Sequence, residues 1–151
     1  MSSTSSSLHC AAQLVASQFE RMIRVAADAP GGPTEIILIA SGSEASLVVE
    51  AYEALASHGI RSRVVSMPSW DIFEHQPQSY RESVLPAEIK ARIAVEQGSA
   101  LGWDRYVGAA GRVIGMETFG ASAPLKELQR KFGFEPERIV DLAREMLGGK
   151  Q

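Results

Sequence analysis

One stretch indicates the fold of this 151-residue chain: Ile36-Ile-Leu-Ile-Ala-Ser-Gly-Ser-Glu44. Five apolar residues in a row are typical of a parallel strand that is covered on both faces. Small polar residues then turn the chain, and residues 44–57 carry apolar side chains at helical spacing up to Gly59, a C-capping residue. A buried strand followed at once by an amphipathic helix predicts a βα unit of a parallel sheet.

The alternation of strands and helices continues toward the C-terminus. Further strands are predicted over residues 61–67, 91–96 and 112–116, and short helices over 70–73 and 77–85. Two longer helices follow, over 123–132 and from Pro136 onward, where Pro at the first turn is favourable. We therefore predict a three-layer α/β/α domain with a mostly parallel sheet of about five strands.

The first part of the chain is predicted to lie outside this domain. Residues 1–25 are assigned to a leader that is partly disordered, because its start is a polar tract, or helical, because residues 12–27 carry a helical stripe. The run Asp28-Ala-Pro-Gly-Gly-Pro33 breaks regular structure and is compatible with a linker. The domain is assigned to residues 26–151.

Composition excludes several classes of partner. The net charge is −3 without a basic block, so we expect no nucleic acid as a partner. The longest strongly apolar run has five residues, too short to span a membrane. The single cysteine, Cys10, fits a reducing compartment, and we expect a cytoplasmic protein.

Ligand sites are expected at the carboxyl ends of parallel strands. The first such loop, formed by Ser41, Gly42, Ser43 and Glu44, resembles an anion site, since small residues precede a helix start. The preferred alternative is an ordinary turn in which Glu44 itself neutralises the helix dipole.

Histidines and motifs point to no catalytic chemistry. His9, His58 and His75 do not have the spacing of a zinc site, and no nucleophile elbow is present. No catalytic, cofactor-binding or metal-binding residue is therefore assigned. Arg105 has the chemistry to bind a carboxylate or phosphate, but a salt bridge to a nearby acid is the preferred interpretation.

Several segments, in order along the chain, resemble one family. They are Ile36–Glu44, Val64-Val-Ser-Met-Pro-Ser-Trp70, Tyr80-Arg-Glu-Ser-Val-Leu-Pro86, Ala91–Gly108, Val113-Ile-Gly-Met-Glu-Thr-Phe-Gly-Ala-Ser-Ala-Pro124 and Phe132-Gly-Phe134. Together they resemble the C-terminal domain of transketolases, over roughly residues 26–147. The segments around residues 102–108 and 119–124 favour transketolase over a ketoacid dehydrogenase β-subunit or a deoxyxylulose-phosphate synthase.

The resemblance implies part of an enzyme of the pentose phosphate pathway. Transketolases use thiamine diphosphate and a divalent metal (Mg or Ca) to move a two-carbon ketol unit between sugar phosphates. Both are held by the first two of three domains, and the enzyme is a dimer. The third domain is implied to support packing and dimer contacts, and the isolated chain is expected to be inactive.

The resemblance also implies exposed surfaces and partners. Without the other domains, an apolar patch is expected, and the candidate interface residues are Trp70, Phe73, Trp103, Arg105 and Tyr106. We expect other transketolase domains or subunits as partners, and a homo-oligomer. The alternative is a stand-alone binding module, either a split-transketolase subunit or a small-anion sensor.

Overall fold

Five strands form one sheet in the computed structural model, which describes residues 24–116, 127, 130–131 and 133–149. The strands are β1 (Arg24–Asp28), β2 (Ile36–Ala40), β3 (Ser62–Ser66), β4 (Arg92–Ser99) and β5 (Arg112–Met116). Their order across the sheet is β1-β3-β2-β4-β5. Strands β2 to β5 run parallel, and β1 pairs antiparallel with β3. The predicted mostly parallel sheet is confirmed.

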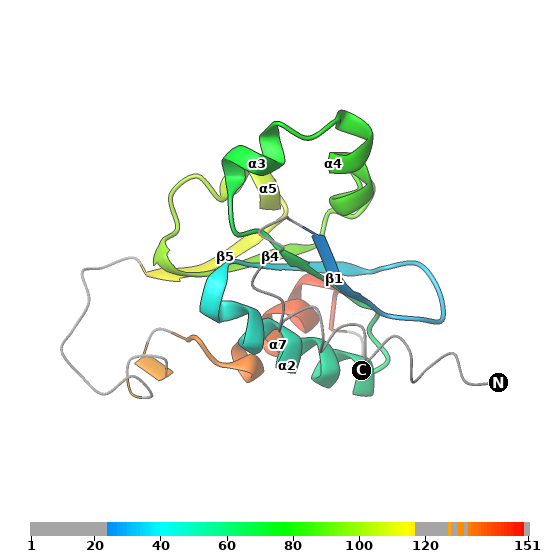
Figure 1. Cartoon of the computed structure of the whole chain (residues 1–151). Helices are drawn as coiled ribbons and strands as arrows, with labels where there is room; N and C mark the ends of the chain where they lie inside the picture. Colours follow the sequence, from blue (N-terminus) through cyan, green and yellow to red (C-terminus); the bar gives the residue numbers. More distant parts are fainter. Residues whose placement is uncertain (1–23, 117–126, 128–129, 132, 150–151) are drawn as a thin grey trace.

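Helices cover both faces of this sheet (Figure 1). On one face lie α2 (Ala45–Ser57) and α7 (Pro136–Met146). On the other lie three shorter helices, α3 (Trp70–Glu74), α4 (Gln78–Val84) and α5 (Asp104–Val107). A short 3-10 turn, η1 (Gly42–Glu44), connects β2 to α2. This arrangement confirms the predicted three-layer α/β/α architecture.

The central strand β2 supplies side chains to both layers. Ile36, Leu38 and Ala40 belong to the apolar cluster under α2 and α7. Ile37 and Ile39 belong to the cluster under the short helices. All five are at most 1% exposed, as the period of two along a strand requires when both faces are covered. Burying each large aliphatic side chain contributes about 1.5–3 kcal/mol.

The two long helices follow their predicted stripes. Helix α2 buries Val48, Ala51 and Leu55, and Gly59 follows it with a φ of 72°, the left-handed conformation that favours glycine at a helix end. Helix α7 begins at Pro136 and buries a stripe of Ile139, Val140, Leu142 and Ala143. The stripes of these two helices form one cluster with the sheet.

The prediction of a helix reaching residue 27 is wrong. Arg24–Asp28 form strand β1, which pairs with β3 along Arg24↔Ser66 to Asp28↔Arg63, with one irregularity in register. An unpaired edge of β3 would leave its backbone groups without partners, and this tertiary requirement overrides the local helical spacing. The rest of the predicted stripe, residues 12–23, lies outside the described residues.

The segment between β1 and β2 is not a linker. It connects two strands of the same sheet, and the Ala29 amide donates to the Ser62 carbonyl at 3.0 Å. The division between a leader, residues 1–25, and the domain, 26–151, otherwise stays a prediction. Of the predicted helix over 123–132, residues 127, 130 and 131 are helical, and the remainder lies outside the described residues. No described helix is long and apolar enough to cross a bilayer.

Candidate functional site

The carboxyl ends of β2 and β4 meet where the chain changes direction across the sheet. The chain runs from β2 to its neighbour β3, and then crosses to the other side of β2 to form β4. In open parallel sheets, ligands bind in the crevice at such a switch point. Ser41 follows β2 here, and Glu96 lies in the last part of β4.

Polar contacts bridge this crevice. The Ser41 hydroxyl donates to Glu96 Oε2 at 2.7 Å, and Glu96 Oε1 accepts the Gly98 amide at 2.8 Å. Glu44, at the start of α2, is 5% exposed. The side chain of Ser43 lies outside the described residues. The crevice thus contains two carboxylates and a hydroxyl that already has an acceptor.

This chemistry bears on the predicted anion site at Ser41–Glu44. An anion needs free donors, and two carboxylates nearby repel it. The geometry therefore favours the ordinary turn that the sequence also allowed. An anion site at this loop stays a prediction.

The candidate aromatic residues lie on the face of the sheet that α3, α4 and α5 cover (Figure 1). Trp103, Tyr106 and Phe73 are 1%, 3% and 4% exposed, and Trp70 is half-buried. The rings of Trp70 and Trp103 pack edge to face with centroids 5.2 Å apart, and Tyr106 lies 5.6–5.9 Å from the other three rings. The expectation of an exposed patch is wrong for Phe73, Trp103 and Tyr106, because α3 and α5 bury these rings against each other.

Among the described residues, Arg105 does not form the expected salt bridge. Its exposed guanidinium lies over the rings of Trp70 and Tyr106, 5.8 Å and 6.0 Å from their centroids. No carboxylate of the described residues lies within ion-pair distance of it. The residue therefore makes cation–π contacts and keeps a charge that a partner can reach.

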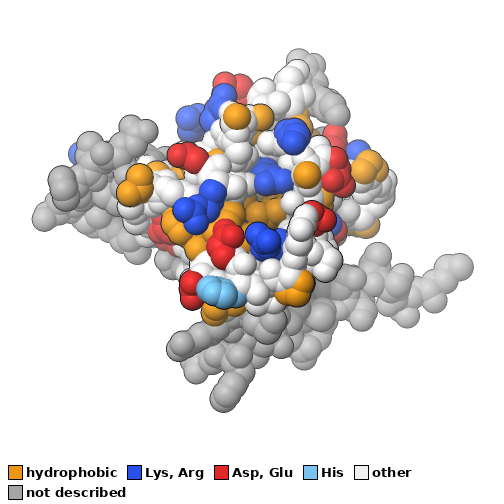
Figure 2. Space-filling view, turned by 90° about the horizontal axis from the view of Figure 1, so that it is seen from above, with side chains coloured by type: hydrophobic (Ala, Val, Ile, Leu, Met, Phe, Trp, Pro, Cys, Tyr) orange, Lys and Arg blue, Asp and Glu red, His pale blue; other side chains and the backbone are white. Residues whose placement is uncertain are grey.

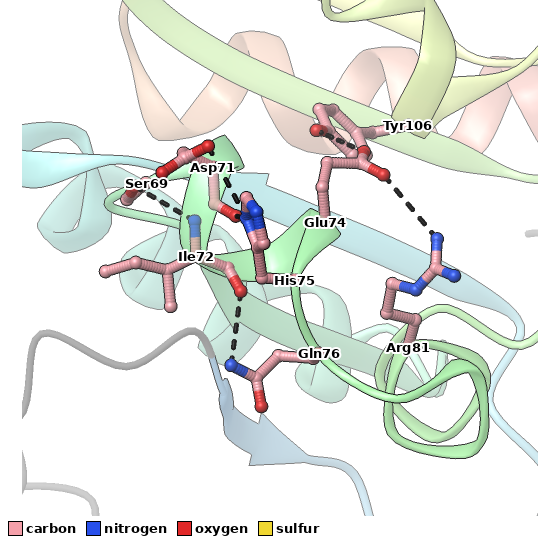
Figure 3. A network of polar contacts seen from close by, with 8 residues as sticks. All are labelled: Ser69, Asp71, Ile72, Glu74, His75, Gln76, Arg81 and Tyr106. Carbon is pink, nitrogen blue, oxygen red and sulfur yellow. Dashed lines mark hydrogen bonds and ion pairs between the residues drawn. The ribbon is translucent and has the colours of Figure 1, made fainter.

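The Tyr106 hydroxyl is part of a polar network beside α3 (Figure 3). It donates to Glu74 Oε1 at 2.8 Å, and Arg81 Nη1 lies 3.5 Å from Glu74 Oε2. Burial, and then the Glu74 carboxylate, raise the pKa of Tyr106 to about 12, while Arg105 opposes the shift. The phenol is therefore protonated at neutral pH and is not poised as a general base.

The rest of the network in Figure 3 holds the ends of α3. The Ser69 hydroxyl accepts the Ile72 amide at 3.4 Å, which caps the N-terminus of the helix. Gln76 Nε2 donates to the Ile72 carbonyl at 3.2 Å, and His75 Nδ1 lies 2.7 Å from the Asp71 carbonyl. These contacts therefore stabilise the ends of a short helix. No three His, Cys, Asp or Glu side chains of the described residues come together as metal ligands.

A cavity of about 450 Å³ opens at the amino ends of the strands, a position that the sequence did not suggest. It is lined by Asp28, Gly32, Pro33, Thr34, Glu35, Arg63, Pro86, Glu88, Ile89 and Lys90. Arg63 is already occupied, since it donates to the Ser83 and Val84 carbonyls at 2.8 and 3.3 Å and to Asp28 at 2.8 Å. The Arg63 guanidinium is therefore already engaged by the protein's own acceptors.

Arg92 has a role that sequence reasoning missed. Its guanidinium donates to the carbonyls of Ile89, Tyr106, Leu85 and Pro86, at 3.0, 2.7, 3.4 and 2.7 Å. Burial lowers the pKa of Arg92, although nearby Glu88 opposes the shift. Arg63 and Arg92 together satisfy the carbonyls of residues 83–86 at the end of α4. The sequence feature that could have indicated this role is a charged residue at the start of an apolar strand.

Comparisons with known proteins identify the family. The model of the transketolase-like TK C-terminal domain matches residues 23–135, more than half of the chain. The chain belongs to this family. A transketolase of Geobacillus stearothermophilus is 48% identical over 124 residues, which cover 82% of this chain and 19% of that protein. Transketolase 1 of Vibrio vulnificus is 53% identical over 120 residues, 80% of this chain and 18% of that protein.

A solved structure shows the same fold for this transketolase C-terminal domain. The transketolase from Leishmania mexicana superposes with a TM-score of 0.73 at 38% identity, covering 85% of this chain and 19% of the other. The chain thus spans about a fifth of the length of the transketolases that it matches. The resemblance noted from the ordered segments is confirmed.

Proposed function

We propose that this chain serves as the C-terminal domain of a cytoplasmic transketolase, within an enzyme that transfers a two-carbon ketol unit between sugar phosphates. The match of residues 23–135 to the family model carries the proposal. In this role the domain supports the packing and dimer contacts of the enzyme. It contributes no catalytic residue of its own.

The cofactor of such an enzyme does not fit the described part of this chain. Thiamine diphosphate is bound through a divalent metal, which needs several oxygen ligands. The described residues bring no three candidate ligand side chains together. The polar groups at the switch point, Ser41 and Glu96, are already hydrogen-bonded to each other. We therefore assign the cofactor and its metal to other domains of such an enzyme.

The proposed partners are other transketolase domains or subunits, including a second copy of this chain. The short-helix side supports this proposal. Figure 2 shows hydrophobic side chains gathered at the centre of that face, with charged side chains of both signs around them. Trp70, half-buried, and Arg105, exposed, are the two candidate interface residues that a partner can reach. Aromatic residues and arginine are enriched in interfaces.

An assay of the purified chain tests the proposed role. The chain is supplied with thiamine diphosphate, Mg²⁺, xylulose 5-phosphate and ribose 5-phosphate, and a full-length transketolase under identical conditions is the control. We expect turnover in the control and none by this chain. Cofactor-dependent turnover by the pure chain would show that it carries chemistry of its own and would overturn the proposal.

A second measurement separates a structural role from a small-anion sensor. Calorimetric titrations of the chain with inorganic phosphate and with ribose 5-phosphate are expected to be flat at millimolar concentration, because carboxylates crowd the Ser41–Glu44 loop. Binding that is lost in Ser41→Ala would instead support the stand-alone sensor, even if the chain also lacks ketol transfer.

A further inference from the structure

Tyr106 connects its own helix, α5, both to α3 and to the sheet. Its hydroxyl donates to Glu74 Oε1 of α3 at 2.8 Å, and its carbonyl accepts Nη1 of Arg92, in β4, at 2.7 Å. Its ring packs against the rings of Trp70 and Phe73 in α3, with centroids 5.6 and 5.8 Å away. Movement of α5 away from the sheet therefore also breaks contacts of α3.

Helix α4 completes a closed ring of contacts. Nη1 of Arg81, in α4, lies 3.5 Å from the Glu74 carboxylate that accepts the Tyr106 hydroxyl, as Figure 3 shows. Just beyond the other end of α4, the Pro86 carbonyl accepts Nη2 of Arg92 at 2.7 Å. The same guanidinium holds the Tyr106 carbonyl, so Arg92 ties α4 to α5. Each of the three short helices is thus linked to the other two.

The apolar side chains of the three helices also share one cluster. Phe73 of α3, Val84 of α4 and Tyr106 of α5 are 4%, 2% and 3% exposed and pack with the same face of the sheet. The helices have 5, 7 and 4 residues, too few to persist once these contacts are lost. Helices α2 and α7 bury their stripes in a separate cluster on the other face, the long-helix cluster. Loss of the short-helix contacts does not directly remove any contact of the long-helix cluster.

We propose that α3, α4 and α5 open and close as one cooperative unit, a lid over one face of the sheet, while the sheet, α2 and α7 stay folded. Each helix depends on the ring of contacts and on the shared cluster, so the loss of one removes support from the other two. Opening uncovers the side chains that Ile37 and Ile39 of β2 place on that face. Contiguous units of this kind are a common form of sub-global opening. This behaviour does not depend on the proposed role of the chain in an enzyme.

Native-state hydrogen exchange of the whole chain, at several urea concentrations below the unfolding transition, tests the unit. The probes are the Phe73, Leu85 and Val107 amides, each hydrogen-bonded to a backbone carbonyl at α3, α4 or α5. As urea rises, the three amides should converge on one opening free energy with one urea dependence, below the values for α2 and α7. Three different values would overturn the proposal. Values equal to those of α2 and α7 would also overturn it, because the short helices would then open only when the whole domain unfolds.

Tyr106→Phe tests the coupling between the helices. It removes the hydrogen bond between α5 and α3 but keeps the ring, and it removes no hydrogen bond of α4. In a cooperative unit, protection of the Leu85 amide in α4 should fall by the same factor as protection of the Phe73 amide in α3. We expect about fivefold for one hydrogen bond. A fall confined to α3 and α5 would contradict the proposal.

Ile139→Val is the matched control on the other face of the sheet. Ile139 of α7 is fully buried in the long-helix cluster, and this variant loses one methyl group there. Protection of the slowest α7 amides should fall about fivefold, while the Phe73, Leu85 and Val107 amides stay unchanged. An equal fall at those three amides would show that they exchange by global unfolding, and would overturn the separate unit. Circular dichroism of both variants verifies that they are folded.

Discussion

The two faces of the sheet are covered in different ways. On one face α2 and α7, with 13 and 11 residues, bury long apolar stripes against the sheet. On the other, α3, α4 and α5 have 5, 7 and 4 residues. Helices this short have little stability of their own. The short-helix face therefore depends on an aromatic cluster, on arginines that reach out from the sheet, and on the network around Glu74.

Removing the largest ring of the aromatic cluster should have the largest effect. Trp103 is 1% exposed and contacts both Trp70 and Tyr106. Trp103→Ala should lower the free energy of unfolding by about 4–5 kcal/mol, and Leu55→Ala on the long-helix face by about 3 kcal/mol. Urea denaturation followed by circular dichroism measures both. A smaller loss for Trp103→Ala than for Leu55→Ala would mean that the cluster is peripheral.

Arg92 should be nearly as important as a core residue. Arg92→Ala leaves the carbonyls of Ile89, Tyr106, Leu85 and Pro86 without this donor. We expect a loss of about 3 kcal/mol from a group of part-buried hydrogen bonds to a charge. Arg112→Ala is the control, because the exposed Arg112 side chain donates to a single carbonyl, that of Gly111. Equal denaturation midpoints for the two variants would contradict the role of Arg92.

Gly102 should show a moderate effect. Gly102→Ala places a methyl group against the Trp70 ring in a backbone conformation that alanine disfavours. We expect a loss of about 1–3 kcal/mol together with a change in tryptophan fluorescence. Gly59→Ala offers a comparison with a similar positive φ but nothing within 4 Å of the added Cβ. If both variants lose the same stability, the contact with Trp70 adds nothing.

Tyr106→Phe should have the smallest effect at neutral pH, about 1 kcal/mol for one hydrogen bond. The difference in stability between this variant and the wild type changes with pH in alkali. The folded state raises the pKa of Tyr106 from 10.0 to about 12, so the wild type keeps this stabilisation below pH 10 and loses it as the pH rises toward 12. Tyr106→Phe should lack that part of the alkaline loss. Urea titrations of both proteins at several alkaline pH values measure this. If the free energy of unfolding falls equally with pH in both proteins, the prediction fails.

The elements with local sequence signals were predicted well. The apolar run of β2, the stripe of α2 and the Pro136 start of α7 are local signals, and each matches an observed element. Strand β1 was missed because its conformation is determined by pairing with β3, about 38 residues away in the chain.

The contacts of the short-helix face were harder to predict for a related reason. Arg63 and Arg92 reach carbonyls that lie up to 21 residues away, and no local pattern specifies such partners. The aromatic residues were recognised as a group, but periodicity did not indicate that Phe73, Trp103 and Tyr106 face inward. Predicting the contact between Ser41 and Glu96 also required knowledge of the strand order, because the two residues are 55 positions apart.

Native-state hydrogen exchange tests the difference between the two faces most directly. Amides of α3 and α4 should open at a lower free energy than those of α2 and β2, because their helices depend on side-chain contacts with the sheet. Arg92→Ala should widen this difference by lowering protection in α4 first. Equal opening free energies on both faces, in the wild type and in Arg92→Ala, would contradict the account.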